Sequence, residues 1–427
     1  MVIDAIQTTI RARRAIEALR AGVPNRDAVL ALGSAYPEIE ETFRSHLDDA
    51  KSAGGEPRSP SGFPVAGNFG SGKSHLLEHL QQAALHEGFV VSKIVISKET
   101  PLHDPVKLYR SAIRAATVPG RVGAALPQIA SELDFNSDDY IQFYRWTQDP
   151  RAIDQRFAAT TYLYENARHN PELLDRIISF WAGDPIQIAE LRRELRQLSK
   201  ASLYTIGKIN VAALAYARFL FTARLMQAAG YAGWVLLFDE VDLVGRYSFQ
   251  QRAKSYAQIA RWTGKINGEL FPGITSVFAI TSDYESMILE QKNDNEIIPG
   301  RLGSSPRESD RLLGRQAERG MKLIGTAIRL TPPSAAVIDD TYARVHAIHA
   351  RAYGWNPPLV SGAVERTTST PMRNYVRSWI NEWDLRRLFP DYTPEIEASE
   401  IKFLYEEDAD LEAPAASDGD DCERAER

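Results

Sequence analysis

Residues 67–74 of this 427-residue chain read Gly67-Asn68-Phe69-Gly70-Ser71-Gly72-Lys73-Ser74, which matches the pattern G-x-x-x-x-G-K-[ST]. Glycines let such a loop wrap closely around phosphate groups, so that backbone N–H groups can bind the phosphate oxygens. Lys73 is expected to neutralise the β- and γ-phosphates, and the Ser74 hydroxyl to bind Mg²⁺. The pattern predicts a nucleotide site made by the residues from Gly67 to His75.

The sequence on both sides of this loop supports the prediction. Residues 63–67 form a short apolar run that predicts a strand, and residues 76–84 place leucines and alanines at helical spacing. Residues 89–97 are rich in β-branched side chains and predict a second strand. Strand, turn, helix and strand form a βαβ unit, which is the context that a phosphate loop requires.

Residues 234–240, Trp-Val-Leu-Leu-Phe-Asp-Glu, predict an apolar strand that ends in two carboxylates. Asp239 is expected to hold the hydration shell of Mg²⁺, and Glu240 to orient and deprotonate the water that attacks the γ-phosphate. The adjacent Asp–Glu pair favours hydrolysis over binding alone. The alternative is a strand that simply ends in solvated acids, and Asp242 is expected to be a solvated neighbour.

Residues 274–282 and 322–330 predict two further strands of the same buried parallel sheet. Thr281 and Ser282 end the first of them. The carboxyl ends of parallel strands meet at one edge of the sheet, so a hydroxyl group there could sense the γ-phosphate. Small polar residues also end strands without any such role.

Several arginines are candidates for a role in catalysis. Arg311, Arg315 and Arg319 are spaced by four residues and would share one face of a helix. One arginine among Arg307, Arg311 and Arg315, assigned here to Arg315, could complete the active site of a neighbouring subunit as an arginine finger. The alternatives are a solvated face paired with nearby acids, and a stripe that contacts DNA.

A last arginine candidate lies near the C-terminal end. Arg373 follows Pro371 at the start of a predicted helix, where proline is favoured. We expect Arg373 to reach over the γ-phosphate from a helical lid, and a purely structural role is an equal alternative.

The pattern along the chain predicts an α/β fold with a parallel sheet core, a large helical insertion and a C-terminal helical lid. The expected segments are an N-terminal helical segment and linker (1–62), the first core part with the phosphate loop (63–99), the helical insertion (100–230), the second core part (231–331), the lid (332–405) and a disordered acidic tail (406–427).

Charge and composition narrow the functional classes. The net charge is −6, but residues 406–427 carry ten acidic residues and two arginines, which leaves about +2 for the rest of the chain. No global basic field indicates nucleic acid, so any DNA contact must come from a local patch. Cys422 is the single cysteine, and no stretch is long and apolar enough for a signal peptide or a membrane span. We therefore expect a cytoplasmic protein without a membrane partner.

The sequence motifs indicate which nucleotide and which metal ion to expect. Residues 291–294, Gln-Lys-Asn-Asp, lack the leading asparagine of the guanine-reading N-K-x-D motif, so ATP with Mg²⁺ is the expected cofactor pair. His75 and His79 fit the zinc pattern H-x-x-E-H, but they lie in the helix that opens from the phosphate loop and no third ligand is evident.

Taken together, the phosphate loop, Asp239-Glu240, the strand end at Thr281-Ser282, the arginine-rich helix and a lid with Arg373 resemble AAA+-type ATPases, nearest to the origin-recognition and STAND-like branch. Three phrases narrow the resemblance: RRAIEALRAGVPNRDAVLALG (13–33), GNFGSGKSHLL (67–77) and RLTPPSAAVIDDTYARVHAIHARAYGW (329–355). They are similar to the ATP-binding BrxC/BrxD family of BREX bacteriophage-defence systems, and the chain is closer in size to BrxD.

The resemblance implies a bacterial cytoplasmic ATPase that acts with other defence-system proteins at DNA. Our leading hypothesis is that the chain self-associates and that its nucleotide cycle remodels or licenses a defence complex on double-stranded DNA. A rival reading is an ATP-bound switch or scaffold with negligible turnover that recruits partners through the helical insertion. A small-molecule kinase would need a substrate pocket that the sequence does not display.

Overall fold

The computed structural model describes residues 2–51, 59–360 and 370–391. Its centre is a six-stranded sheet in the order β3-β2-β4-β5-β1-β6, parallel throughout except for β3, which runs antiparallel to β2. The strands are β1 (Ser61–Ala66), β2 (Val90–Val95), β3 (Ala116–Thr117), β4 (Trp234–Asp239), β5 (Ile274–Ile280) and β6 (Ile328–Arg329). The predicted mixed α/β fold with a mostly parallel sheet is confirmed.

The central strands are buried on both faces. Every residue of β4 and β5 is buried, and the two strands pair in register from Trp234 opposite Ile274 to Phe238 opposite Phe278. Side chains that alternate along the strands therefore enter two separate cores. Continuous apolar runs, rather than alternating ones, made these strands predictable from the sequence.

One face of the sheet is covered by α3 (Pro37–Lys51) and α4 (Lys73–His86), which pack on side chains such as Val65 and Leu237. The other face belongs to the largest core of the molecule, built with α5 (Pro105–Arg114), α11 (Val211–Ala228), α12 (Phe249–Trp262), α13 (Asp294–Gly303) and α14 (Glu308–Gly325). The phosphate loop leads from the carboxyl end of β1 to the start of α4.

Residues 100–230 are helical, as the sequence predicts. Besides α5 and α11 they contain α6 (Ala125–Ser131), α7 (Asp138–Thr147), α8 (Gln155–Asn166), α9 (Pro171–Ala182), α10 (Ile188–Gln197) and the short η1 (Ala201–Leu203). The aromatic side chains of this block pack inward, with Tyr140, Phe143 and Phe157 buried. The two-residue strand β3 was not expected, because so short an edge strand carries no periodic signal.

The strand predicted at 322–330 is wrong over most of its length. Helix α14 continues to Gly325, and only Ile328–Arg329 pairs with β1. Met321 and Ile324 lie on the buried face of α14, and Lys322 forms an i,i+4 ion pair with Glu318 at 2.8 Å. These helical contacts outweigh the apolar run that suggested a strand.

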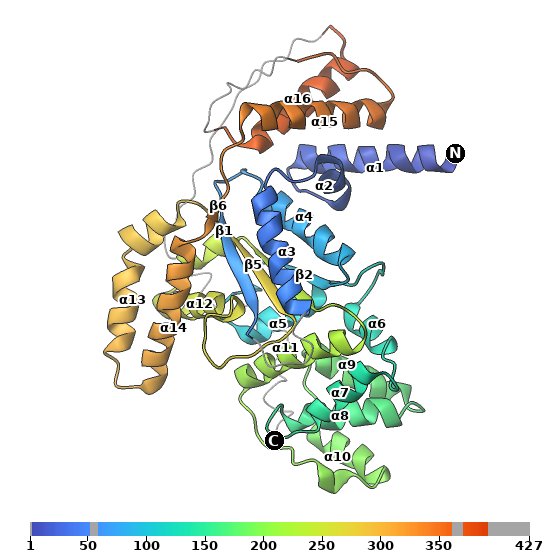
Figure 1. Cartoon of the computed structure of the whole chain (residues 1–427), viewed down its shortest axis with the longest axis vertical. Coiled ribbons are helices and arrows are strands. Elements are labelled where there is room, and N and C mark those ends of the chain that lie inside the picture. Colours follow the sequence, from blue (N-terminus) through green and yellow to red (C-terminus); the bar gives the residue numbers. More distant parts are fainter. Residues whose placement is uncertain (1, 52–58, 361–369, 392–427) are drawn as a thin grey trace.

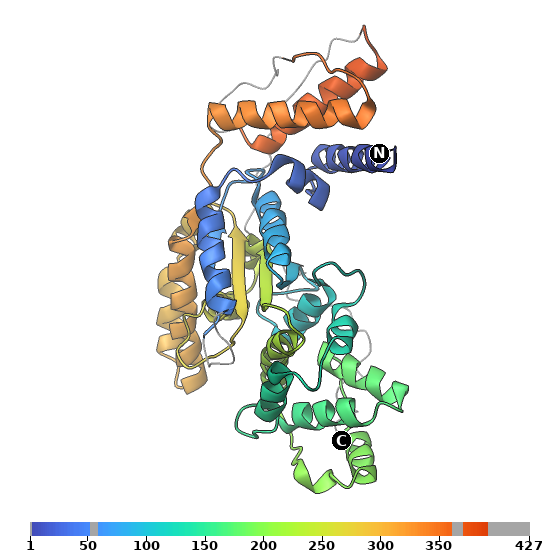
Figure 2. The ribbon, with the colours of Figure 1, turned by 45° about the vertical axis from the view of Figure 1, so that its right-hand side comes forward.

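The helices from the two ends of the described chain share one core. α1 (Val2–Ala21) and α2 (Arg26–Leu32) pack against α15 (Ala335–Tyr353) and α16 (Met372–Leu388). Figures 1 and 2 show these four helices as a layer at the top, the sheet in the middle and α6–α10 below. The predicted acidic tail, residues 361–369 and 392–405 of the predicted lid, and residues 52–58 of the predicted linker lie outside the described residues.

An ionic network ties this upper layer together. Asp384 of α16 pairs with Arg20 of α1 at 2.6 Å and with the fully buried His349 of α15 at 3.3 Å. The other ring nitrogen of His349 receives a hydrogen bond from Trp355 Nε1 at 3.0 Å. Three helices from opposite ends of the chain therefore meet at one carboxylate. None of the described helices is long and apolar enough to cross a membrane.

Candidate nucleotide-binding site

The phosphate loop joins β1 to α4 with a backbone that glycine permits. Gly70 and Gly72 have φ angles of 76° and 103°, in the left-handed region. A Cβ atom on Gly67 would lie 2.5 Å from Ser71 Oγ, and one on Gly70 would lie 2.9 Å from Pro371 Cβ. The loop is thus closely packed and ends at the N-terminus of α4, where unpaired N–H groups attract anions.

Lys73, the first residue of α4, lies across this loop. Its Nζ donates hydrogen bonds to the carbonyl oxygens of Gly67 at 2.7 Å and Asn68 at 3.3 Å. Burial lowers the pKa of Lys73, while the nearby acids Asp242 and Glu240 oppose this shift. A desolvated ammonium group beside a loop of N–H donors suits the binding of a phosphate.

A small hollow next to the loop gathers residues from four separate parts of the chain. It is lined by Phe69, Gly70, Gly72, Lys73, Ser74, Glu240, Asp242, Thr281 and Arg373. Lys73, Ser74, Glu240, Thr281 and Arg373 are all site residues that the sequence analysis named. The predicted Ser282 is half-buried and does not line the hollow.

Two acids mark the end of β4. Asp239 is buried, and its Oδ1 accepts a hydrogen bond from the Glu240 N–H at 3.0 Å. Glu240 has left-handed backbone angles, φ 58° and ψ 34°, which are unusual for a residue with a side chain. Desolvation and the Asp239 carboxylate raise the pKa of Glu240, and the positive charges of Lys73 and Arg373 oppose the rise.

The expectation for Asp242 is wrong. Its side chain is only 6% exposed, it lines the hollow, and its Oδ1 has no hydrogen-bond partner among the described residues. Burial raises the pKa of Asp242 to about 6, with Lys73 opposing this shift. After β4 the chain enters η2 (Val241–Arg246), a 3₁₀ turn that carries Asp242 inward, and no residue pattern in the sequence marks that turn.

The two predicted arginines lie in different places. The backbone N–H of Arg373 donates to the Gly70 carbonyl oxygen at 3.4 Å, and its guanidinium carbon lies 5.0 Å from the centre of the Phe69 ring. Arg315 lies in α14, more than half exposed, with a guanidinium nitrogen 3.6 Å from Glu308. Within the described chain, Arg373 contacts the phosphate loop and Arg315 lines neither the hollow nor the larger cavity described below.

A comparison with known protein families agrees with this geometry. The family model of the BREX system ATP-binding protein BrxC/D matches residues 8–140 and 155–366, well over half of the chain. The chain belongs to the BrxC/D family. No individual curated protein matches the sequence. Family membership indicates ATP binding and a role in BREX phage defence together with other components of that system.

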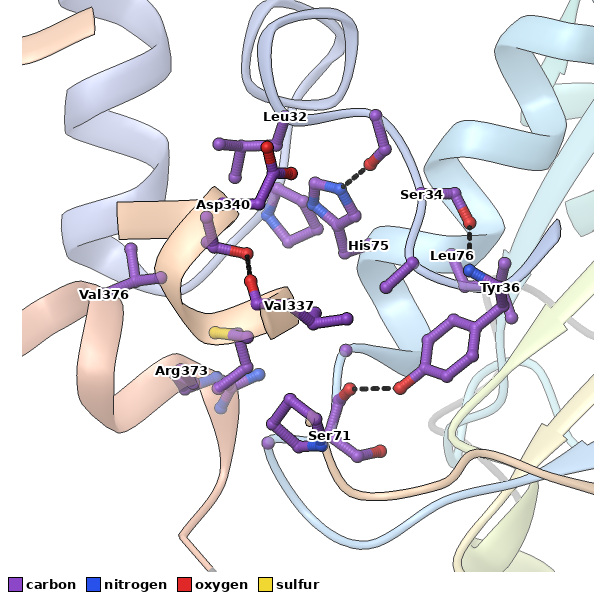
Figure 3. Close-up of a pocket in the computed structure, with 18 of the residues that line it drawn as sticks. Leu32, Ser34, Tyr36, Ser71, His75, Leu76, Val337, Asp340, Arg373 and Val376 are labelled. Carbon is purple, nitrogen blue, oxygen red and sulfur yellow. Dashed lines mark hydrogen bonds between the residues drawn. The ribbon is translucent and has the colours of Figure 1, made fainter. Parts of the chain in front are cut away.

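The BrxC/D chain also has a larger cavity, of about 480 Å³, on the other side of the phosphate loop (Figure 3). Three regions line it: the α1–α2 segment and the turn after α2, the start of α4, and the segment from Thr331 into α15 with the start of α16. Ligand pockets commonly have volumes of roughly 300 to 1,000 Å³. The cavity shares Gly70, Gly72, Ser74 and Arg373 with the hollow, so the two adjoin at the phosphate loop.

Hydrogen bonds attach the N-terminal segment to the phosphate loop at this cavity. A ring nitrogen of His75 lies 2.8 Å from the Gly33 carbonyl oxygen, and Tyr36 Oη donates to the Ser71 carbonyl oxygen at 3.4 Å (Figure 3). Burial lowers the pKa of His75, which keeps the ring neutral. His79 pairs with Glu40 at 3.1 Å, so the two histidines have different partners.

The sequence analysis named none of the apolar residues of this cavity. Leu32 and Tyr36 lie more than 300 residues before Val337 and Val376, so the two pairs meet only in the folded chain (Figure 3). The sequence pointed to these regions only through the family resemblance, since residues 13–33 and 329–355 are two of the three phrases on which it rests. Both phrases lie on the walls of this cavity.

The residues present fit a magnesium nucleotide. The loop N–H groups and Lys73 suit phosphates, and Ser74 and Asp242 offer a hydroxyl group and a carboxylate in the hollow. Asp239 does not line the hollow, but its buried carboxylate adjoins Glu240 and acts electrostatically on Lys73. Mg²⁺ in such sites needs only one or two carboxylates, because phosphate oxygens and waters supply the remaining ligands. The described residues hold no group of three or more His, Cys, Asp and Glu side chains that could hold a metal by themselves.

Proposed function

We propose that this BrxC/D-family chain is a cytoplasmic ATPase of the AAA+ type, nearest to BrxD, that hydrolyses ATP to ADP and phosphate with Mg²⁺. The single observation that carries the proposal is the hollow that brings Lys73, Ser74, Glu240, Thr281 and Arg373 together at the phosphate loop. Binding alone needs only the loop and Lys73. A buried Asp239, an adjacent Glu240 that lines the hollow and a hydroxyl group at Thr281 suit the activation of water.

The residues have distinct roles in this mechanism. Lys73 and the loop N–H groups bind the β- and γ-phosphates and neutralise charge as the terminal bond breaks. Glu240 accepts a proton from the attacking water, and its raised pKa makes it a better base. Mg²⁺, when bound, shields the phosphate charges. Ser74 and Asp239 hold its ligand sphere, and Thr281 contacts the γ-phosphate.

The nucleoside of ATP occupies the larger cavity in this proposal. The aromatic ring of Tyr36 and the aliphatic side chains of Leu32 and Val337 provide apolar contact area for a purine base. The cavity is lined both by the layer of α1, α2, α15 and α16 and by the phosphate loop and α4 of the sheet layer, so ATP would contact both layers. ATP would hold these layers together. Binding and release of ATP would then close and open the lid relative to the sheet.

The strand order supports the AAA+ assignment. β5, which leads to Thr281, lies between the phosphate-loop strand β1 and the acidic strand β4. This arrangement sets the sensing hydroxyl between the loop and the two acids. The proposed domain division keeps the boundaries of the sequence analysis, with α1 and α2 acting together with the 332–405 lid through their common core.

Assembly completes the proposed function. Arg315 lies outside the hollow of its own chain and is more than half exposed, which supports a role as an arginine finger in a neighbouring copy. The cycle of ATP binding and hydrolysis would then remodel or license a BREX defence complex on double-stranded DNA. The competing function is an ATP-bound switch or scaffold with negligible turnover.

Steady-state ATP hydrolysis, measured against protein concentration with and without duplex DNA, tests the proposal. The Glu240→Gln variant supplies the blank. A specific rate that rises with concentration, and rises further with DNA, supports shared active sites on a nucleic-acid platform. A flat rate equal to the blank would refute the ATPase and leave the switch or scaffold.

A further inference from the structure

Asp242 lies in the hollow but has no part in the mechanism above. It belongs to the first turn of η2, is 6% exposed and lines the hollow together with Lys73 and Ser74. Its Oδ1 atom is buried without a hydrogen-bond partner among the described residues. A buried, unpartnered carboxylate oxygen is costly, and in a native protein it calls for a ligand or an ion.

The charges around Asp242 change when a nucleotide binds. Among the acids that act on Lys73, Asp242 has the largest electrostatic effect. Lys73 is also the residue that the phosphates of ATP engage, so its charge is then directed to them. The negative charge of Asp242 would then lie beside the phosphates with less neutralisation by Lys73, unless a second cation arrived with the nucleotide.

We propose that Asp242 is a second carboxylate of the Mg²⁺ site, which, together with Ser74 and Asp239, holds the water ligands of the ion that accompanies ATP. The inference rests on the proposed function, since it needs ATP in this hollow. Mg²⁺ retains several waters when it binds proteins, and a buried carboxylate oxygen is a strong acceptor for them. Asp242 then selects Mg–ATP over metal-free ATP, whose phosphates its charge repels.

This role predicts opposite effects of one substitution on two forms of the ligand. Asp242→Asn removes the charge that repels bare phosphates, so binding of metal-free ATP stays equal or becomes tighter. The same change removes an acceptor for the waters of Mg²⁺, so binding of Mg–ATP weakens. A residue that only stabilised the fold would move both affinities in the same direction.

The experiment measures the affinity of the full chain for the fluorescent analogue mant-ATP in EDTA and in excess MgCl₂. For Asp242→Asn we expect the enhancement of binding by Mg²⁺ to fall by about tenfold or more, the usual effect of losing a residue that orients metal ligands. Asp283→Asn is the matched control, because Asp283 is an exposed acid that also acts on Lys73 but does not line the hollow. The control should keep the wild-type enhancement.

A second readout reports the metal directly. Water-proton relaxation in a titration with Mn²⁺ and ATP should show weaker Mn²⁺ binding by the Asp242→Asn complex than by the wild-type complex. Thermal melting shows whether Asp242→Asn folds, and Asp242→Ser takes its place in both assays if it does not.

Two results would overturn the role of Asp242: an unchanged Mg²⁺ enhancement in the variant, or equal losses with and without Mg²⁺. Failure of the wild-type chain to bind mant-ATP under either condition is a separate result. It would refute the proposed function itself, and the role of Asp242 with it.

Discussion

Glu240 combines a strained backbone conformation with the proposed role of general base. Its left-handed backbone costs a non-glycine residue roughly 1 kcal/mol or more, and such residues are found where the surrounding structure over-determines them. The hydrogen bond from its N–H group to Asp239 Oδ1 holds the peptide between the two acids. The strain therefore fixes the direction in which the chain leaves β4, and with it the entry of Glu240 and Asp242 into the hollow.

Substitutions of Lys73 and Glu240 should separate binding from hydrolysis. Lys73→Ala removes a charged donor to the phosphates and should weaken ATP binding by about 10- to 100-fold. Glu240→Gln keeps the shape of the site but removes the base, so binding should persist while turnover falls by about 100-fold or more. Titration calorimetry and phosphate release measure the two effects. Equal ATP affinity in the wild type and Lys73→Ala would contradict the site.

His103 should make the stability of the protein depend on pH. Its ring packs edge-on against Tyr247 with the centres 5.1 Å apart, and its Nδ1 is buried without a hydrogen-bond partner among the described residues. Burial lowers the pKa of His103 to about 4, from an ordinary value of 6.5. Between these values the unfolded chain binds more protons than the folded chain, so the free energy of unfolding falls as the pH falls.

Replacing His103 by phenylalanine removes this proton-binding group and keeps a flat ring. Between pH 6.5 and pH 4 the wild type should lose on the order of 2 kcal/mol more of its unfolding free energy than the variant does. Urea unfolding at several pH values measures the difference. Parallel curves for the two proteins would show that His103 does not titrate in this window.

At the scale of elements, a buried ion pair joins the segments that follow β4 and β5. Arg252 of α12 binds Asp294, at the start of α13, through two hydrogen bonds of 2.8 and 3.0 Å, and it donates to the Tyr247 carbonyl oxygen at 2.6 Å. Tyr256 Oη donates a hydrogen bond to the same carboxylate and lies 2.9 Å from Tyr284 Oη. Tyr284 follows Thr281, which lines the hollow, by three residues. The α13–α14 pair is therefore anchored next to the hollow.

Asp294→Asn should destabilise the fold by about 3 to 5 kcal/mol, because it leaves the Arg252 charge buried without its partner. Glu318→Gln on α14 is the control. It removes an exposed partner of Lys322, so its effect should stay within about 0.5 kcal/mol. Urea unfolding of both variants provides the comparison, and similar values for the two would show that the buried pair contributes little.

The packing of α12 against α14 explains why one glycine is needed there. A Cβ atom on Gly320 would lie 1.9 Å from the Tyr256 carbonyl oxygen, so the two helices touch at their backbones. This contact also explains the failed strand prediction for residues 322–325. Because α14 packs so closely on α12, it stays helical through the apolar residues that follow Gly320 and ends at Gly325.

At the scale of the whole molecule, the candidate site joins two layers. The phosphate loop belongs to the sheet layer, whereas Arg373 and much of the wall of the larger cavity belong to the layer of α1, α2, α15 and α16 (Figure 1). A nucleotide between these layers contacts both of them, so its hydrolysis would change the contacts of the whole layer of α1, α2, α15 and α16. Arg315, exposed on α14, could then contact the nucleotide of a neighbouring copy and respond to whether it has been hydrolysed.

A mixing experiment tests that arrangement. Arg315→Ala and Glu240→Gln should each be nearly inactive alone. Mixed together they should regain activity, because a subunit that retains Glu240 can receive Arg315 from the other variant. ATP hydrolysis as a function of the mixing ratio measures this, with Arg319→Ala in place of Arg315→Ala as the control. No recovery at any ratio would exclude Arg315 as a finger in trans.

Much of the core could be predicted from the sequence. Strands β1, β2, β4 and β5 were expected within a few residues of their observed bounds, as were helix α4 and the start of helix α16. Each has either a continuous apolar run or a clear helical spacing bounded by glycine or proline. β3 and β6 were missed or misplaced, because two-residue strands depend on their partners in the sheet and not on their own pattern.

The sequence by itself determined the family and located the phosphate loop and the acidic end of β4. A phosphate loop and an acidic strand end are runs of adjacent residues, so their backbone geometry follows from local sequence. Only the tertiary structure decided the burial of Asp242, the contact of Arg373 with the loop, and the larger cavity between Tyr36 and Val337. Burial and cavities arise where segments hundreds of residues apart pack together, and no local pattern records which segments will meet.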